Sequence, residues 1–224
     1  EECVNEYNNI DDEYNAHQSG GRIINLNNET VLFSIGDFRS RYRAQMDNSI
    51  FGKVLKFNKK NKDYEVISMG HRNPQGLFYN KESNFLLEAE HGPQGGDEVN
   101  ELFAGKNYGW PVITYGKDYN DRKVGLGTAQ NGMEQPLHYW DPSVAPSSLL
   151  IYSGNTYGAK EGELFVTSLK NKTLFKVSLV EKQITVNEFY KNEFGRIRNI
   201  EISPGGVLYL ITDDNNGSII KLLN

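Results

Sequence analysis

The sequence predicts an all-β protein, and two observations carry this prediction. Helical periodicity is scarce, whereas short runs rich in β-branched and aromatic residues recur along the whole chain. Turns rich in Asn, Gly, Asp and Lys separate these runs. Strands at such spacing without intervening helices are typical of a sandwich, a barrel or a propeller. The expected strands cover residues 30–37, 52–58, 64–70, 83–92, 147–154, 162–170, 173–180, 182–190, 205–214 and 217–224.

A repeated unit favours the propeller among these architectures. Each copy has an arginine, a short strand, a polar turn, and a second strand of Leu, Phe or Tyr that ends in Gly or Asp. Two copies cover residues 21–37 and 197–214, and a more divergent copy covers 71–92. Residues 162–179 match the later part of the same unit. Repetition of one supersecondary unit is the sequence signature of such folds.

The spacing of the repeats agrees with propeller blades of four strands each. From Leu164 to Leu208 is 44 residues, and from Leu32 to Phe85 it is 53. A blade takes roughly 45 residues, so this chain has room for about five. The first residues are acidic and polar, with neither an initiator Met nor the apolar core of a signal peptide. We therefore expect the chain to begin part-way through a longer protein.

Composition excludes several classes of protein. Hydrophobic residues make up 38% of the 224 residues, which is enough for a sizeable core in one large domain. The net charge of −5 argues against a nucleic-acid partner. The sequence contains no run of 18 apolar residues, so it predicts no membrane span. Cys3 is the only cysteine, so the fold is not a disulfide scaffold.

The stretch MGHRNPQGLFYN, residues 69–80, raises the first question about function. Pro74 and Gly76 are typical of a β-turn, and an arginine before such a turn is most often a solvated charge. The alternative is that the turn aims Arg72 and Asn73 at a ligand. The local sequence by itself favours the solvated charge.

The segment 90–116 offers oxygen ligands for a hard cation. The carbonyl groups of Gly92 and Pro93 and the carboxylates of Asp97 and Glu98 are groups of the kind that Ca²⁺ binds. The alternative is a Gly-rich loop with a solvated acidic pair, which is the more frequent case. The following NYGWP, with Tyr108, reads as a packed aromatic turn of the core.

The remaining candidates are a histidine and three cations at strand ends. His17 lies beside a Gly pair that permits close approach of a ligand, and imidazole suits a general base, although most such histidines are surface residues. Lys170 ends an expected strand. Arg196 and Arg198 are two residues apart and so share a strand face, where they could meet a polyanion or form a solvated basic surface.

Eight motifs give the chain a strong resemblance to a known family. It resembles the soluble quinoprotein sugar dehydrogenases, the glucose/sorbosone dehydrogenase family, which use pyrroloquinoline quinone (PQQ). The motifs occur in the family's order and span more than nine-tenths of the chain, from His17 to the C-terminus. They are HQSGGRI, GHRNPQG, EHGPQGGDEVN, GKNYGWP, EQPLHYWDPSVAPSS, LFVTSLK, GRIRNI and LYLITDDNNGSIIKL.

The resemblance implies a six-bladed β-propeller with PQQ over its axis. The chain is then a single propeller domain over residues 1–224, the C-terminal four to five blades of a longer chain that has one or two further blades at its N-terminus. The implied activity is oxidation of an aldose to its lactone, with hydride transfer to the quinone. The implied location is the periplasm or the extracellular space, and the electron acceptor is unknown.

The resemblance also implies a role for each candidate residue. His17 matches the base that takes the proton of the anomeric hydroxyl, and Arg72 and Asn73 match residues beside the quinone. Lys170, Arg196 and Arg198 match the cations that hold the carboxylates of PQQ, and the carbonyls of Gly92 and Pro93 match ligands of the Ca²⁺ that also binds PQQ. Asp97, Glu98 and Tyr108 fall where some members bind a second Ca²⁺. Trp140 lies near the position of an aromatic residue that contacts sugar in some members.

Two further functions fit the same scaffold. A propeller of this type can be a non-enzymatic module that binds a ligand or a partner, although the base and the cofactor cations are all retained here. It can also be a calcium-dependent hydrolase of sugar lactones, but the sequence shows no clustered acidic metal site that would support this chemistry.

Overall fold

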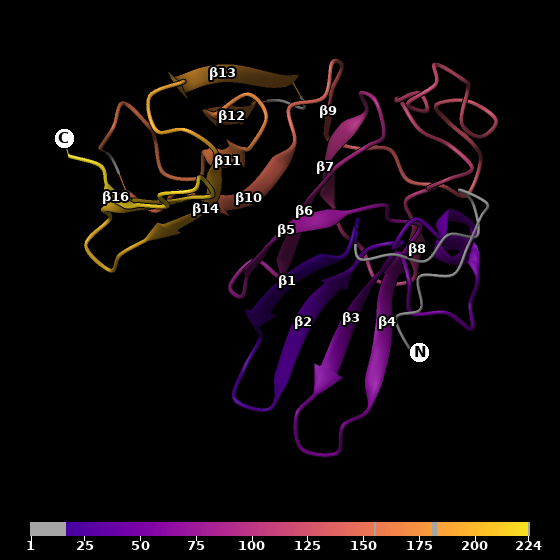
Figure 1. Cartoon of the computed structure of the whole chain (residues 1–224). Helices are drawn as coiled ribbons and strands as arrows, with labels where there is room; N and C mark the ends of the chain where they lie inside the picture. The colour runs from indigo at the N-terminus through magenta and orange to yellow at the C-terminus, as the bar shows by residue number, and fades with distance from the viewer. Residues whose placement is uncertain (1–16, 155, 181–182, 224) are drawn as a thin grey trace. The chain divides into compact units, whose positions relative to one another are not determined.

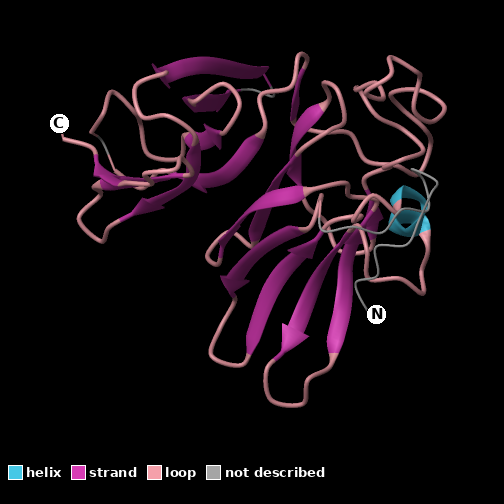
Figure 2. Ribbon diagram, in the orientation of Figure 1, coloured by secondary structure: helices cyan, strands magenta, loops and turns pink. Residues whose placement is uncertain are grey.

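A computed structural model describes residues 17–154, 156–180 and 183–223. In these residues the regular structure is β-sheet, apart from one short 3₁₀ helix, Arg41–Gln45 (Figure 2). None of their helices is long and apolar enough to cross a membrane. The chain divides into two compact units, Glu1–Ser143 and Val144–Asn224, and each is described by itself. The single domain expected over residues 1–224 stays a prediction.

The first unit contains two sheets, whose strands are labelled in Figure 1. In both sheets consecutive strands pair antiparallel, and only β8 pairs parallel, with β4. The first sheet has the order β1-β2-β3-β4-β8, with β1 Gly20–Asn25, β2 Thr30–Ile35, β3 Lys53–Asn58, β4 Tyr64–Met69 and β8 Lys106–Asn107. The second has the order β5-β6-β7-β9, with β5 Pro74–Asn80, β6 Phe85–Glu90, β7 Asp97–Glu101 and β9 His138–Trp140.

The second unit also contains two antiparallel sheets of consecutive strands. Each has the simple up-and-down order of a propeller blade. One sheet consists of β10 Pro146–Ile151, β11 Leu164–Ser168, β12 Thr173–Val180 and β13 Gln183–Lys191. The other consists of β14 Ile197–Ile202, β15 Leu208–Thr212 and β16 Ile219–Lys221.

The strand and repeat predictions are confirmed by this topology. All ten expected strands are present, with ends that differ by a few residues. The three units with an arginine form the first two strands of a sheet, namely β1–β2, β5–β6 and β14–β15. Residues 162–179 form β11 and β12, the second and third strands of their sheet. Leu32, Phe85, Leu164 and Leu208 therefore all lie in second strands, which explains the spacing.

One local prediction was wrong and several elements were missed. Pro74 and Gly76 do not form a turn, because both lie in β5, where the register with β6 shifts between them. Proline is tolerated as the first residue of a strand, and a glycine accompanies the irregular register. The sequence reading also missed β7, β8, β9 and the 3₁₀ helix.

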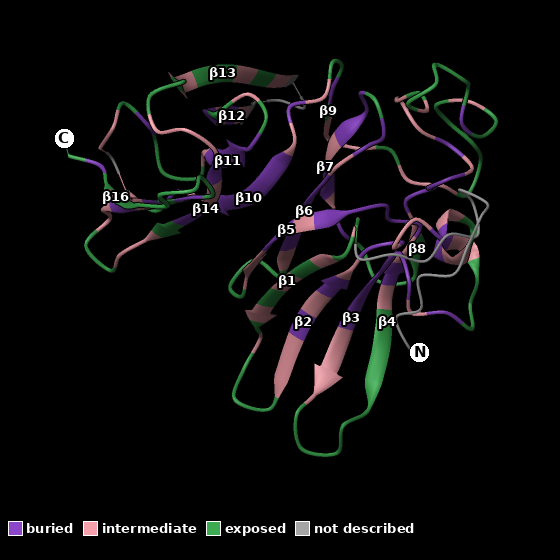
Figure 3. Ribbon diagram, viewed as in Figure 1, coloured by how far each residue is buried: buried purple, intermediate pink, exposed green. Residues whose placement is uncertain are grey.

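The core of the first unit lies between its two sheets. Leu32 and Val54 of the first sheet pack in one cluster with Leu77 and Leu86 of the second, and Tyr108 closes the cluster. Figure 3 shows buried positions in purple, along most of β6 and at the start of β3. Burying each such side chain stabilises the folded state by roughly 1.5–3 kcal/mol. This packing holds in place the strand ends that carry the site residues.

Candidate active site

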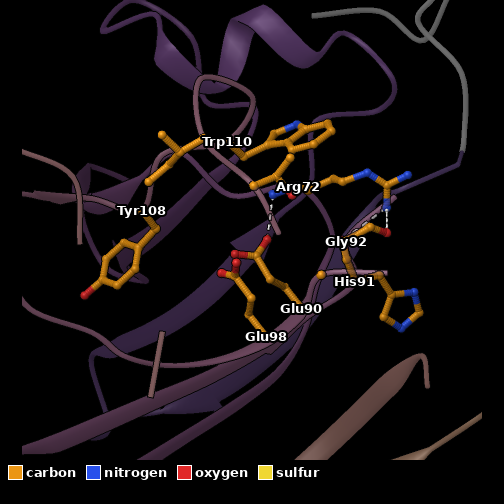
Figure 4. Close-up of a pocket in the computed structure, with 10 residues that line it drawn as sticks. Arg72, Glu90, His91, Gly92, Glu98, Tyr108 and Trp110 are labelled. Atoms are coloured by element: carbon orange, nitrogen blue, oxygen red, sulfur yellow. Dashed lines mark hydrogen bonds between the residues drawn. The ribbon is translucent and has the colours of Figure 1, made fainter. Parts of the chain in front are cut away.

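Arg72 is buried, with 5% of its surface exposed, so its interpretation as a solvated charge is wrong. Its guanidinium donates to the carbonyl oxygens of His91, at 3.1 Å, and Gly92, and stacks 5.3 Å from the centre of the Trp110 ring. Its backbone N–H donates to Glu90 Oε2 at 2.6 Å. Figure 4 shows the side chain extended between Trp110 and the Gly92 carbonyl. These contacts hold the Arg72 side chain in one position, and its predicted contact with a ligand stays a prediction.

Asn73 connects Arg72 to the segment that carries His17. Its Oδ1 accepts a hydrogen bond from the N–H of Gly20 at 3.1 Å. The same segment is held from the other side, because Gly36 N donates to the carbonyl of Ser19 at 3.0 Å. His17 is exposed at the start of this anchored segment. The structure therefore brings the His17 segment to Arg72 and Asn73, although 53 residues separate Gly20 from Asn73.

Gly36 makes this close approach possible. A Cβ atom at Gly36 would lie 1.7 Å from the carbonyl oxygen of Gln18, a backbone contact that cannot form. Gly36 therefore allows the His17 segment to approach the end of β2. A side chain here would push the segment away from Arg72.

Asp37 links the same segments through its buried carboxylate. It accepts from Trp110 Nε1 at 2.7 Å. In the amide orientation that satisfies both neighbours, Gln18 donates to Asp37 Oδ1 at 2.6 Å and accepts from Arg72 at 2.8 Å. Burial raises the pKa of Asp37 to about 6, against the opposing effect of the Arg72 charge. The sequence reading did not single out Asp37 or Gln18.

A cluster of buried acidic side chains lies beside the arginine. Asn100 Nδ2 is within 3.1 Å of Glu88 Oε2, 3.5 Å of Glu90 Oε1 and 3.3 Å of Glu98 Oε2. His71 Nδ1 lies 3.3 Å from Glu90 Oε1. Burial, and then the charge of Glu90, raise the pKa of both Glu88 and Glu98. The expectation that acidic residues do not cluster was wrong, whereas metal binding by this cluster stays untested.

The loop that leads to β7 contains the predicted calcium ligands. Asp97 is fully buried, and its two carboxylate oxygens accept from Gly92 N at 2.9 Å and from Ser143 Oγ at 2.6 Å. The solvated acidic pair was therefore the wrong alternative for Asp97, which shapes the loop that presents the carbonyls of Gly92 and Pro93. The role of these groups as metal ligands stays a prediction.

Tyr108 and Trp110 pack in the core, as the aromatic-turn interpretation predicts. Their exposed fractions are 5% and 6%. Tyr108 donates its hydroxyl to the carbonyl of Glu101 at 2.6 Å, and its ring stacks on His71. Burial raises the pKa of Tyr108. The phenol thus takes part in the packing of the fold, and the role of Tyr108 as a metal ligand stays a prediction.

A small cavity of about 10 Å³ lies among these residues. Its volume is at the lower limit for a single water molecule. Figure 4 shows the carboxylates of Glu90 and Glu98 side by side at this cavity. It is lined by Arg72, Glu90, His91, Gly92, Gly96, Glu98, Tyr108, Trp110, Ile113 and Thr114.

The three predicted cofactor cations lie in the second unit. Lys170 is exposed just after β11. Arg196 and Arg198 both reach Asp213, Arg196 at 3.4 Å, so the two guanidinium groups point the same way as predicted. Hydrogen bonding from Arg198 is the largest effect that lowers the pKa of Asp213. These cations are described only within their own unit.

Trp140 lies in β9 and is 9% exposed. Its backbone pairs with Asp97, and its ring packs edge-on against His138 at 4.6 Å. Its predicted contact with sugar stays a prediction.

Glu88, Glu90 and Asn100 were also missed by the sequence reading. One signal was present, since Glu88 and Glu90 occupy alternate positions of the apolar strand FLLEAE. Charged residues are almost never fully buried unless they are paired, so two of them on one strand face indicate a polar interior.

Comparison with known proteins identifies the family. The family model for glucose/sorbosone dehydrogenase matches residues 6–221. The chain belongs to this family. It is 32% identical to the aldose sugar dehydrogenase YliI of Escherichia coli over 91% of this chain, and 29% identical to the quinoprotein glucose dehydrogenase B of Acinetobacter calcoaceticus over 78%. It spans 59% and 54%, respectively, of the length of these relatives.

A solved structure supports the fold of this family member. A crystal structure of a glucose dehydrogenase matches with a TM-score of 0.83 and 34% identity, over 92% of this chain and 64% of that one. The predicted all-β fold of the quinoprotein sugar dehydrogenase type is thereby confirmed. The number of blades and the expected missing blades stay predictions.

Proposed function

We propose that the protein oxidises aldose sugars to lactones with PQQ. The observation that carries this proposal is the meeting at Arg72 of segments that are distant in the sequence, one of which carries His17. Family membership supports a sugar dehydrogenase, and the name of the Acinetobacter relative supports a quinone cofactor.

One orphaned donor at Arg72 fits an anionic quinone. Among the described residues, the buried Nε of Arg72 has no hydrogen-bond partner. Leaving a buried donor unsatisfied costs about 1–3 kcal/mol, more for a charged group, and a ligand oxygen would remove that cost. Lys170, Arg196 and Arg198 are exposed or partly exposed cations suited to the carboxylates of PQQ.

The chain's own residues would act on the sugar as follows. His17 takes the proton of the anomeric hydroxyl as a general base. Arg72 places positive charge where negative charge develops, and its stacking on Trp110 holds it there. Asn73 positions the His17 segment through Gly20. When bound, PQQ supplies the acceptor for the hydride from the anomeric carbon, which completes the two-electron oxidation.

The calcium part of the proposal rests on oxygen donors. The carbonyl oxygens of Gly92 and Pro93 would bind the Ca²⁺ that accompanies PQQ. The Gly92 oxygen would use one lone pair for Ca²⁺ and the other for the hydrogen bond that it accepts from Arg72. A second Ca²⁺ would use Glu98, the Tyr108 carbonyl and Asp97. Because both carboxylate oxygens of Asp97 already accept hydrogen bonds, we expect Glu98 to supply most of the negative charge around this second Ca²⁺.

The test is reconstitution of the full-length protein with PQQ and Ca²⁺, followed by dye reduction with a panel of aldoses, because we expect the 224-residue chain alone to be inactive or poorly stable. We expect sugar-dependent reduction that falls about 10²–10⁴-fold in His17→Gln while PQQ binding, followed by absorbance, is retained. The control is Glu82→Gln, because Glu82 is exposed in the β5–β6 turn and has no role in this proposal. Bound quinone without sugar-dependent reduction would contradict the proposal and favour a non-enzymatic binding module.

The acidic cluster gives one reason to test a second function, the calcium-dependent hydrolysis of sugar lactones. Carboxylates and an amide are typical ligands of Ca²⁺. Lactone turnover without PQQ that is abolished by Glu98→Gln would support this function. The periplasmic or secreted location and the electron acceptor belong to the proposal for the whole protein.

A further inference from the structure

Three metal-ligating side chains converge beneath Arg72. One ligand atom each of His71, Glu88 and Glu90 lies within 4.8 Å of the other two. The exposed fractions of these residues are 0%, 0% and 4%. His71 precedes β5, whereas Glu88 and Glu90 share one face of β6, so the antiparallel pairing of the two strands creates the convergence.

Two buried oxygen atoms at this place have no hydrogen-bond partner. They are Glu88 Oε1 and Asn100 Oδ1, in a chain segment that the structure describes fully. The amide nitrogen of Asn100 has only two protons, but it faces the carboxylates of Glu88, Glu90 and Glu98. Hydrogen bonds from Asn100 alone cannot satisfy this set.

Charge gives a separate argument. Among the described residues, the imidazole of His71 is the only basic side chain that pairs with any of these three carboxylates. Arg72 contacts the cluster through its backbone N–H, while its guanidinium binds the carbonyls of His91 and Gly92. Buried carboxylates that stay ionised are normally paired or coordinated to metals, and apart from His71 no described side chain supplies positive charge to this cluster.

We propose that His71, Glu88 and Glu90 bind a divalent transition-metal ion of the Mn²⁺ or Zn²⁺ class. The three ligands differ from the calcium ligands discussed above, although Asn100 connects Glu88 and Glu90 to Glu98, and the site goes beyond the proposed dehydrogenase function. The imidazole nitrogen selects against Ca²⁺ and Mg²⁺, which bind oxygen, whereas mixed nitrogen and carboxylate ligands suit Mn²⁺ and Zn²⁺. Rotation of the Asn100 amide would present its unpartnered oxygen as a further ligand.

The geometry around His71 supports coordination through Nδ1. Its Nε2 lies 2.8 Å from Ser68 Oγ, so an Nε2–H can donate to the serine and leave the Nδ1 lone pair facing the cluster. Nδ1 is 3.3 Å from Glu90 Oε1. Two ligands of one ion, each bound at about 2.1 Å, are about 3.0–3.4 Å apart in octahedral or tetrahedral geometry.

The ion would position Arg72 without contacting the substrate. Glu90 Oε1 faces His71, while Glu90 Oε2 accepts the backbone N–H of Arg72. An ion held by His71 and Glu90 thus fixes the carboxylate that holds the backbone of Arg72. Outer residues of this kind orient the groups that they support.

The experiment measures metal binding directly and does not depend on sugar oxidation. The purified full chain is stripped with a chelator and titrated with Mn²⁺, and the loss of the free-Mn²⁺ EPR signal gives the stoichiometry. We expect one Mn²⁺ per chain, displaced by Zn²⁺, with affinity lowered at least about tenfold in Glu88→Gln. Glu82→Gln, an exposed position in the β5–β6 turn, is the matched control and should bind as the unaltered chain does.

A second measurement needs no variant. Pulsed EPR of Mn²⁺ in the unaltered chain should show nitrogen coupling from His71, and this result remains decisive if Glu88→Gln fails to fold. The proposal is overturned if no Mn²⁺ or Zn²⁺ binds, or if nitrogen coupling is absent. It is also overturned if the bound ion is insensitive to Glu88→Gln but lost in Glu98→Gln, because the ion would then occupy the predicted calcium site.

Discussion

The two units place their functional charges in opposite surroundings. In the first unit, Arg72, Asp37 and Glu88 are at most 5% exposed and contact backbone or side chains from distant segments. In the second, Arg196 and Arg198 have side chains that are 42% and 39% exposed and share one carboxylate, Asp213. Burial makes a charge costly to leave without partners, whereas water screens an exposed one. The first unit thus buries its charges among partners, whereas the second leaves Arg196 and Arg198 partly exposed beside Asp213.

The largest difference is expected when one arginine is removed from each unit. Arg72→Ala leaves Asp37 without its nearby cation and empties the space beside Trp110, so we expect the free energy of unfolding to fall by about 3–5 kcal/mol. Arg196→Ala should change it by less than about 1 kcal/mol. Urea unfolding of both variants measures the contrast. Equal losses of unfolding free energy in the two variants would show that burial does not determine how much these arginines contribute to stability.

The pH dependence of stability tests the buried carboxylate of Asp37. Its pKa is raised from 3.8 to about 6. The unfolded chain therefore loses this proton first, and stability falls as pH rises from about 4 to about 6, by roughly 3 kcal/mol at 1.36 kcal/mol per pKa unit. Asp37→Asn should remove this part of the slope, whereas Asp121→Asn, an exposed turn residue, should leave it unchanged. Identical slopes in the three proteins would contradict the assignment.

Gly36→Ala should separate the His17 segment from Arg72. The new methyl group meets the Gln18 carbonyl, and overpacking of this kind costs about 1–3 kcal/mol. Gly127→Ala is the matched control, because a Cβ there meets no atom within 4 Å. We expect a lower melting temperature and faster amide exchange at residues 18–20 only in Gly36→Ala. Unchanged exchange would show that Gly36 does not anchor the segment.

The smallest effect is expected at Asp213. Its pKa is lowered mainly by hydrogen bonding from Arg198, so its contribution is present at neutral pH and is lost as pH falls below the pKa of the unfolded chain. Because the side chain is 39% exposed, Asp213→Asn should cost less than about 1 kcal/mol at low salt. The stability difference between the two proteins should vanish in about 1 M salt, because salt then screens charge interactions beyond about 3 Å. A loss of stability that persists at high salt would show that the pair of Asp213 and Arg198 behaves like the buried charges of the first unit.

The sequence predicted the strands far better than the surroundings of the charged side chains. Strands such as TVLFSI carry their β-branched and apolar pattern locally, so β2 and its counterparts could be predicted. The strand DEVNE could not be predicted locally, because its acidic residues resemble a loop. It becomes a strand by pairing with β6 and β9.

The burial of Arg72 was not predictable from its own motif. Its neighbours Pro74 and Gly76 resemble a turn, and turns are usually solvated. The groups that bury it come from Gln18, Gly92 and Trp110, and tertiary contacts decide such cases. The family resemblance implied a role for Arg72 but none for Asp37 or Glu88, whose partners are visible only once β2 and β6 have been placed.

The unsatisfied Nε of Arg72 has a consequence for spectroscopy. A buried N–H without an acceptor exchanges slowly with solvent, and its proton lacks the deshielding that a hydrogen bond produces. In a protein labelled with ¹⁵N at arginine, Arg72 should therefore give a separate Nε–H resonance. A ligand oxygen that accepts from it would move this resonance downfield, so the arginine is an internal sensor of ligand binding that needs neither an added dye nor turnover.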